Sequence, residues 1–187
     1  KGLKVTGHVP LSMDVIGASN AGLNSMEHFR NLELSCASNS DELLLQRQQL
    51  LASGKEDKGG VLRSRIHKKQ REIALKNFDV NKANEVLEVL KKNDTWQIPT
   101  LTLNTAFARR PFAAKDWQKS FSYLPKNIKE QWLNYINNLV KSEVKPFDKK
   151  YSKWMFDITR RVHNKGIKIM ASTDPPIFFL TPGLSLH

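Results

Sequence analysis

The strongest constraint on the fold is an alternation of short strand-like strings with longer helical stretches. Residues 3–10 alternate apolar and polar side chains and end at a proline, and residues 24–28 form a second short string. Further strings at 96–104 and 167–171 are rich in apolar and β-branched residues. Because helical segments separate these strings, the pattern predicts a parallel sheet with right-handed crossovers.

Helical periodicity supports this interpretation in the intervening stretches. Residues 80–92 place Ala83, Val86, Leu87 and Leu90 at positions i, i+3, i+4 and i+7 of one helix face. The remaining predicted helices cover residues 14–21, a stretch beginning at 40 after a run of capping residues, and residues 61–74, 128–144 and 146–165. Residues 105–126 contain prolines and aromatics and are predicted to form a long loop with one short helix.

Length and composition limit the class of protein. A chain of 187 residues suits one domain or two small ones, and is too short for a complete (β/α)8 barrel of roughly 250 residues. With 40% hydrophobic and 26% charged residues it has the composition of a globular protein, and no apolar run predicts a membrane span. The single cysteine, Cys36, excludes an internal disulfide framework and a zinc site built from cysteines.

The net charge of +12 makes nucleic acid a possible partner, with 63–71 as the most basic run. However, residues 1–36 are neutral, and the excess lies in 55–92 and 93–174, which are largely predicted helices. Lysines on solvated helix faces need no partner. We therefore expect no nucleic-acid partner and keep a basic nucleic-acid-binding module as an alternative.

Polar side chains follow the predicted strands. His8 ends the first strand, His28 the second, residues 100–104 the third, and Asp174 the fourth. In parallel sheets functional residues collect at the carboxyl ends of the strands, so these groups are expected to converge. Imidazole and carboxylate together suit zinc or a neighbouring divalent metal, with an open position for water.

These residues carry a resemblance. Five strings occur in a fixed order along the chain: Gly7-His8-Val9-Pro10, Gly22-Leu23-Asn24-Ser25-Met26-Glu27-His28, Trp96-Gln97-Ile98-Pro99-Thr100-Leu101, Gly166-Ile167-Lys168-Ile169-Met170-Ala171-Ser172-Thr173-Asp174 and Pro182-Gly183-Leu184-Ser185-Leu186-His187. Together they resemble the metal-dependent amidohydrolase superfamily, in its imidazolonepropionase-like, prolidase-type branch.

The resemblance implies an α/β fold. Residues 1–187 would form one partial domain, the C-terminal part (strands 5–8) of a TIM-like (β/α)8 barrel. His8 would end the fifth strand, His28 the sixth, and Asp174 the eighth. Residues 37–78, rich in Leu, Gln, Lys and Arg, would be a helical insertion.

The resemblance also implies a function, the hydrolysis of C–N bonds in amides, peptides or cyclic amides by a metal-activated water. His8, His28 and Asp174 would bind one or two divalent ions, zinc being the expected metal, and Asp174 would also accept the proton of the attacking water. Arg109 and Arg110, in the predicted rim loop, are candidates for binding a substrate carboxylate.

The sequence also departs from that family. The His-x-His pair that the family carries on its first strand occurs nowhere in the 187 residues. The chain is therefore expected to be the C-terminal half of a longer hydrolase, to bind metal poorly alone and not to turn over substrate. Two open strand edges, at 3–7 and 167–172, predict self-association or pairing with a complementary N-terminal half. A non-catalytic barrel relative is the remaining alternative.

Overall fold

A computed structural model describes residues 2–53 and 59–182 of the chain. The chain divides into two compact units, each described here by itself. The first comprises Lys1–Ile98 with Thr159–Met170, and the second comprises Pro99–Ile158 with Ala171–His187. Among the described residues, no helix combines the length and the apolar character needed to cross a membrane.

The first unit contains a small parallel sheet. Its strands are β1 (Thr6–Gly7), β2 (Ser25–Glu27) and β3 (Trp96–Ile98), in the order β1-β2-β3. Both pairs are parallel, as the alternation of strands and helices predicted. A single parallel bridge from Gln97 to Ile169 continues the pairing beyond β3.

The prediction that the chain forms strands 5–8 of a TIM-like (β/α)8 barrel is wrong. The structure is 63% helical, and its sheet has three strands of two or three residues each. The predicted strand over 167–171 is reduced to the bridge at Ile169. Strands of two or three residues are too short to form a barrel wall.

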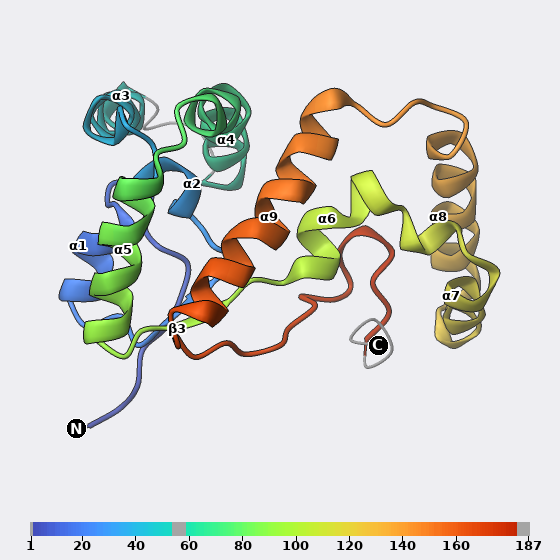
Figure 1. The fold of residues 1–187 in the computed structure, drawn as a ribbon. Helices are drawn as coiled ribbons and strands as arrows, with labels where there is room; N and C mark the ends of the chain where they lie inside the picture. The colour runs from blue at the N-terminus through green and yellow to red at the C-terminus, as the bar shows by residue number, and fades with distance from the viewer. Residues whose placement is uncertain (1, 54–58, 183–187) are drawn as a thin grey trace. The chain divides into compact units, whose positions relative to one another are not determined.

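Two helices of the first unit pack against each other near the sheet. α1 (Val15–Asn20) and α5 (Val80–Lys92) lie side by side (Figure 1). Both begin at an aspartate whose carboxylate accepts backbone N–H groups of the first turn, Asp14 in α1 and Asp79 in α5. The predicted periodicity of α5 is confirmed, because Ala83, Val86, Leu87 and Leu90 are all buried.

The helices predicted within 37–78 are present. α2 (Leu32–Ser35) is followed by α3 (Ser40–Ser53) and α4 (Gly59–Lys76), with α3 and α4 side by side (Figure 1). Two apolar clusters lie among the helices of this unit. One contains Leu34, Ala37, Leu43 and Ala74, and the other contains Leu11, Leu62 and Ile66, with Leu50 and Leu51 packed against it.

The strand predicted over 96–104 stops at Ile98, and α6 (Leu101–Arg109) follows. The alternating Thr-Leu-Thr-Leu string is compatible with either structure, because Leu103 and Ala106 are also three residues apart on a helix and are both buried. Thr100, directly before α6, has a left-handed backbone conformation. Tertiary packing therefore overrides the local β preference.

The second unit is helical. After α6 come η1 (Pro111–Ala113), α7 (Lys115–Lys119), η2 (Ser120–Tyr123), α8 (Lys126–Leu139) and η3 (Ile177–Phe179). The helix α9 (Pro146–Asn164) belongs to this unit up to Ile158 and to the first unit from Thr159. The helices predicted at 128–144 and 146–165 correspond to α8 and α9, while the predicted loop at 105–126 is largely helical. The core of this unit contains Ala106, Phe112, Phe121, Ile136 and Phe179.

Candidate functional site

Two of the predicted metal ligands, His8 and His28, lie together. His8 directly follows β1 and His28 directly follows β2, and these strands are neighbours in the sheet. Their imidazole rings contact each other edge to face, with ring centroids 4.9 Å apart. The backbone N–H of His28 donates to the carbonyl of Ile98 at the end of β3, over 2.6 Å, which fixes His28 at the edge of the sheet.

This spacing fits two ligands of one small divalent ion. With Zn–N distances of about 2.0–2.1 Å and tetrahedral angles, two imidazoles on one zinc have ring centroids about 5 Å apart. The observed separation of 4.9 Å agrees. Imidazole nitrogen is also a preferred zinc donor. The described residues contain no group of three His, Cys, Asp or Glu side chains that could hold a metal ion, so this pair supplies two donors only.

Several predicted site positions have an unusual backbone conformation. The φ angles of His28, Thr100 and Asp174 are 58°, 47° and 56°, in the left-handed region that side-chain-bearing residues rarely occupy. Such conformations cost of order 1–3 kcal/mol each and cluster at functional sites. They are three of the eight non-glycine residues with a positive φ among the described residues, and the others include Phe29 and Asp94, which are not predicted site positions.

Asp174, predicted to be both ligand and proton acceptor, belongs to the second unit. It follows the buried Thr173 and precedes η3. His8 and His28 thus lie together within the first unit, whereas Asp174 belongs to the second unit. The last string of the resemblance falls at 182–187, of which residues 183–187 lie outside the described residues.

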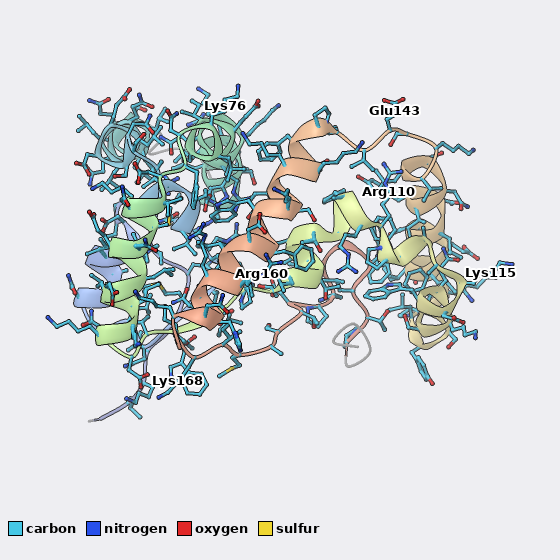
Figure 2. All side chains as sticks on the ribbon, viewed as in Figure 1. Lys76, Arg110, Lys115, Glu143, Arg160 and Lys168 are labelled. Atoms are coloured by element: carbon cyan, nitrogen blue, oxygen red, sulfur yellow. The ribbon has the colours of Figure 1, made fainter. Side chains whose placement is uncertain are left out.

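The two arginines predicted to bind substrate sit at the end of α6 in the second unit. Arg109 is exposed, and its guanidinium lies over the ring of Phe156 at 5.4 Å. Arg110 extends toward the end of α8 (Figure 2) and donates from Nη1 to the carbonyl of Val140 over 3.3 Å. Because Arg110 caps a helix end, Arg109 is the better of the two for a substrate carboxylate.

A cavity of about 320 Å³ adjoins His8 in the first unit. Its walls come from β1, the turn after it and the end of α1, and include Thr6, His8, Met13 and Ala21. This volume is within the range of small-molecule sites, and His8 is one of the residues that line it.

Sequence reasoning missed a buried polar cluster in the first unit, which we call the arginine cluster. It combines the turn before α2 with side chains of α2, α3 and α4. Its members are Arg30, Asn31, Glu33, Arg47, Arg63, His67, Gln70 and Arg71.

Hydrogen bonds hold the arginine cluster together. Arg71 Nε donates to Glu33 Oε1 over 2.9 Å, and the Glu33 side chain is 1% exposed. Arg47, also 1% exposed, donates to the neutral acceptors Gln70 Oε1 and Asn31 Oδ1, at 2.9 and 2.5 Å. Arg47 therefore has no bonded carboxylate within the described part of the chain.

Burial and charge shift the pKa values in the arginine cluster. Burial alone raises the pKa of Glu33, but the positive groups around it, Arg71 foremost, more than offset this and hold its pKa below the usual value. Burial, reinforced by the Arg71 charge, lowers the pKa of His67 to about 3. His67 is therefore neutral at physiological pH.

One signal in the sequence could have revealed this cluster. Arg63, His67 and Arg71 are spaced by four residues and so lie on one face of α4. That face also carries Ile66, which is fully buried. Lys76 on the same helix is solvated, as expected of helical lysines (Figure 2). The basic run at 63–71 therefore contains side chains of the arginine cluster together with solvent-exposed side chains.

The chain was compared with models of protein families, with curated proteins and with solved structures, and no match was found in any of the three. The resemblance to the amidohydrolases therefore depends on the residue strings themselves.

Proposed function

We propose that this chain supplies metal-binding and proton-transferring groups of a metal-dependent hydrolase that cleaves C–N bonds in small amides, peptides or cyclic amides. The observation that carries the proposal is the contact between His8 and His28 at the ends of adjacent parallel strands, with ring centroids 4.9 Å apart. Zinc is the proposed metal, because two imidazoles and an open coordination position suit it.

The chemistry divides between the metal and the side chains. A divalent ion, when bound, lowers the pKa of a coordinated water toward about 7 and polarises the scissile carbonyl. The His8 and His28 imidazoles would hold the ion, and the hydrogen bond from the His28 backbone N–H to the Ile98 carbonyl fixes the backbone of His28 at the end of β2. By the resemblance, Asp174 would accept the proton of the attacking water and deliver it to the leaving nitrogen.

The cavity beside His8 supports a small substrate. Its volume of about 320 Å³ suits a compact amide or dipeptide, and its lining residues include Thr6 of β1 and His8.

The hydrolase step is tested on protein purified from its source cells through a tag on this chain, so that any partner polypeptide stays attached. Release of amine from a panel of dipeptides and cyclic amides is measured with and without added zinc. The proposal expects turnover that requires metal and falls at least about 100-fold in Asp174→Asn.

The controls separate chemistry from folding. His28→Ala is expected to lose turnover together with bound metal, whereas Asp174→Asn is expected to keep most of the metal bound by His8 and His28. His163→Ala, at an exposed position near the end of α9, is the matched control and should be unchanged. Full turnover in Asp174→Asn, or no C–N hydrolysis across the panel, contradicts the proposal.

A further inference from the structure

The first unit contains a second cavity, of about 270 Å³, toward the amino ends of its strands. The lining residues precede or begin a strand, or follow the bridge to β3, and all belong to the first unit: Lys4, Asn24, Ser25, Asp94, Trp96 and Met170. We call this cavity the Trp96 pocket. Neither His8 nor His28 lines it, so it is separate from the histidine pair at the carboxyl ends of β1 and β2.

The strand register places apolar groups of the Trp96 pocket on one face of the sheet. Ser25 is paired with Trp96 in the parallel ladder, and Gln97 is bridged to Ile169. Because successive side chains point to opposite faces of a sheet, Ser25, Trp96 and Met170 share one face. Trp96 is half-buried and Met170 is 46% exposed. This face therefore offers an indole ring and a thioether to a ligand.

The polar groups of the Trp96 pocket favour an anion over a cation. The Asp94 carboxylate accepts from Lys168 Nζ over 2.8 Å, and the same ammonium, labelled in Figure 2, lies 5.3 Å from the centroid of the Trp96 ring. Lys4 has no ion pair among the described residues. Asn24 Oδ1 accepts a backbone N–H over 2.9 Å, which leaves its amide N–H groups as donors. The pocket thus has one carboxylate, whose charge Lys168 balances, and one cation, Lys4, that is not balanced.

We propose that the Trp96 pocket binds a small carboxylate that carries an aromatic ring. The ring packs against Trp96 and Met170, because aromatic rings make favourable offset or edge contacts with an indole and favourable contacts with a thioether sulfur. The carboxylate accepts from the Lys4 ammonium and the Asn24 amide. The volume of about 270 Å³ is just below the range of about 300–1,000 Å³ for ligand pockets, so the ligand is small. The proposal is independent of the proposed metal centre.

The experiment follows the indole N–H resonances of the ¹⁵N-labelled full chain, with Trp96→Phe to assign the Trp96 signal. Phenylacetate is the probe, and we expect the Trp96 resonance to shift saturably with a Kd below about 10 mM. The indole signals of Trp117, Trp132 and Trp154, all in the second unit, should stay in place. Acetate, which lacks the ring, and phenethylamine, which reverses the charge, should bind at least about tenfold more weakly.

Variants at Lys4 test the charged contact. Lys4→Gln should weaken phenylacetate binding at least about fivefold, because it removes the ammonium, whereas Lys4→Arg keeps a cation and should bind within about twofold of the wild type. Lys69→Gln makes the same change of charge at an exposed position on α4 and is the matched control, with unchanged binding expected.

Met170→Gln is a second variant, also at an exposed position, that tests the contact with the ring. It removes the thioether and should weaken phenylacetate binding severalfold. Four results would each overturn the proposal: equal binding of phenylacetate and acetate, tighter binding of phenethylamine, equal effects of Lys4→Gln and Lys69→Gln, or no saturable shift of the Trp96 signal.

Discussion

At the scale of single residues, burial decides which side chains of the first unit are available for chemistry. Cys36 is fully buried, and burial raises the pKa of its thiol, with Glu33 adding to the effect. The thiolate is the reactive form of cysteine, so Cys36 is a packing residue and not a nucleophile. His67 is also buried, and its lowered pKa has a measurable consequence for stability.

His67 makes the fold sensitive to acid. Its pKa is about 3 in the folded chain and about 6.5 when unfolded, so between these values only the unfolded state binds the proton. Stability is therefore unaffected above pH 6.5 and falls as the pH drops from about 6.5 toward 3. The loss approaches about 1.4 kcal/mol per pH unit, or about 2–3 kcal/mol by pH 4.5.

Urea unfolding of wild type and His67→Gln across this pH range measures the effect. The amide preserves an acceptor for Arg30 and carries no titratable proton, so the acid slope of the free energy of unfolding should become shallower by about that amount. The charges facing His67 are those of Arg30, Arg47, Arg71 and Glu33, and all remain in the variant. Parallel pH profiles for the two proteins would mean that His67 is protonated in the folded state.

At the scale of elements, the sequence predicts those helices and strands whose bounds are determined by local chemistry. α5 is predicted closely, because its apolar periodicity and buried face agree. The stretch at 100–104 is mispredicted, because its alternation suits a strand and only long-range packing places it in α6. The contact between His8 and His28 was inferred from strand ends alone. The arginine cluster was missed, because its members come from three helices and a turn.

The N-cap of α5 tests this local reasoning. The Asp79 carboxylate accepts the N–H groups of Asn81 and Lys82, at 2.7 and 3.0 Å. Asp79→Ala removes both bonds and should lower the free energy of unfolding by about 1 kcal/mol. Asp79→Asn keeps an acceptor and should lose less than about half of that. Chemical denaturation compares them, and equal losses in the two variants would assign the effect to charge alone.

At the scale of the whole molecule, the structure changes the interpretation of the net positive charge and of the open sheet edge. Part of the net charge of +12 belongs to the buried arginine cluster and not to a nucleic-acid-binding face. Beside β1, the side chains of Leu3 and Val5 are exposed, and among the described residues β1 pairs with β2 alone. An open strand edge favours pairing with another chain. We therefore propose that this edge mediates self-association or pairing with a complementary chain.

Nuclear magnetic resonance of the ¹⁵N-labelled imidazoles tests whether His8 and His28 bind one metal ion. On titration with zinc, the ring nitrogens of His8 and His28 should shift together and saturate at the same zinc concentration. Those of His67, which is buried in the arginine cluster, and of His163 should stay in place. Independent shifts of His8 and His28, or no shift of either, would contradict the claim.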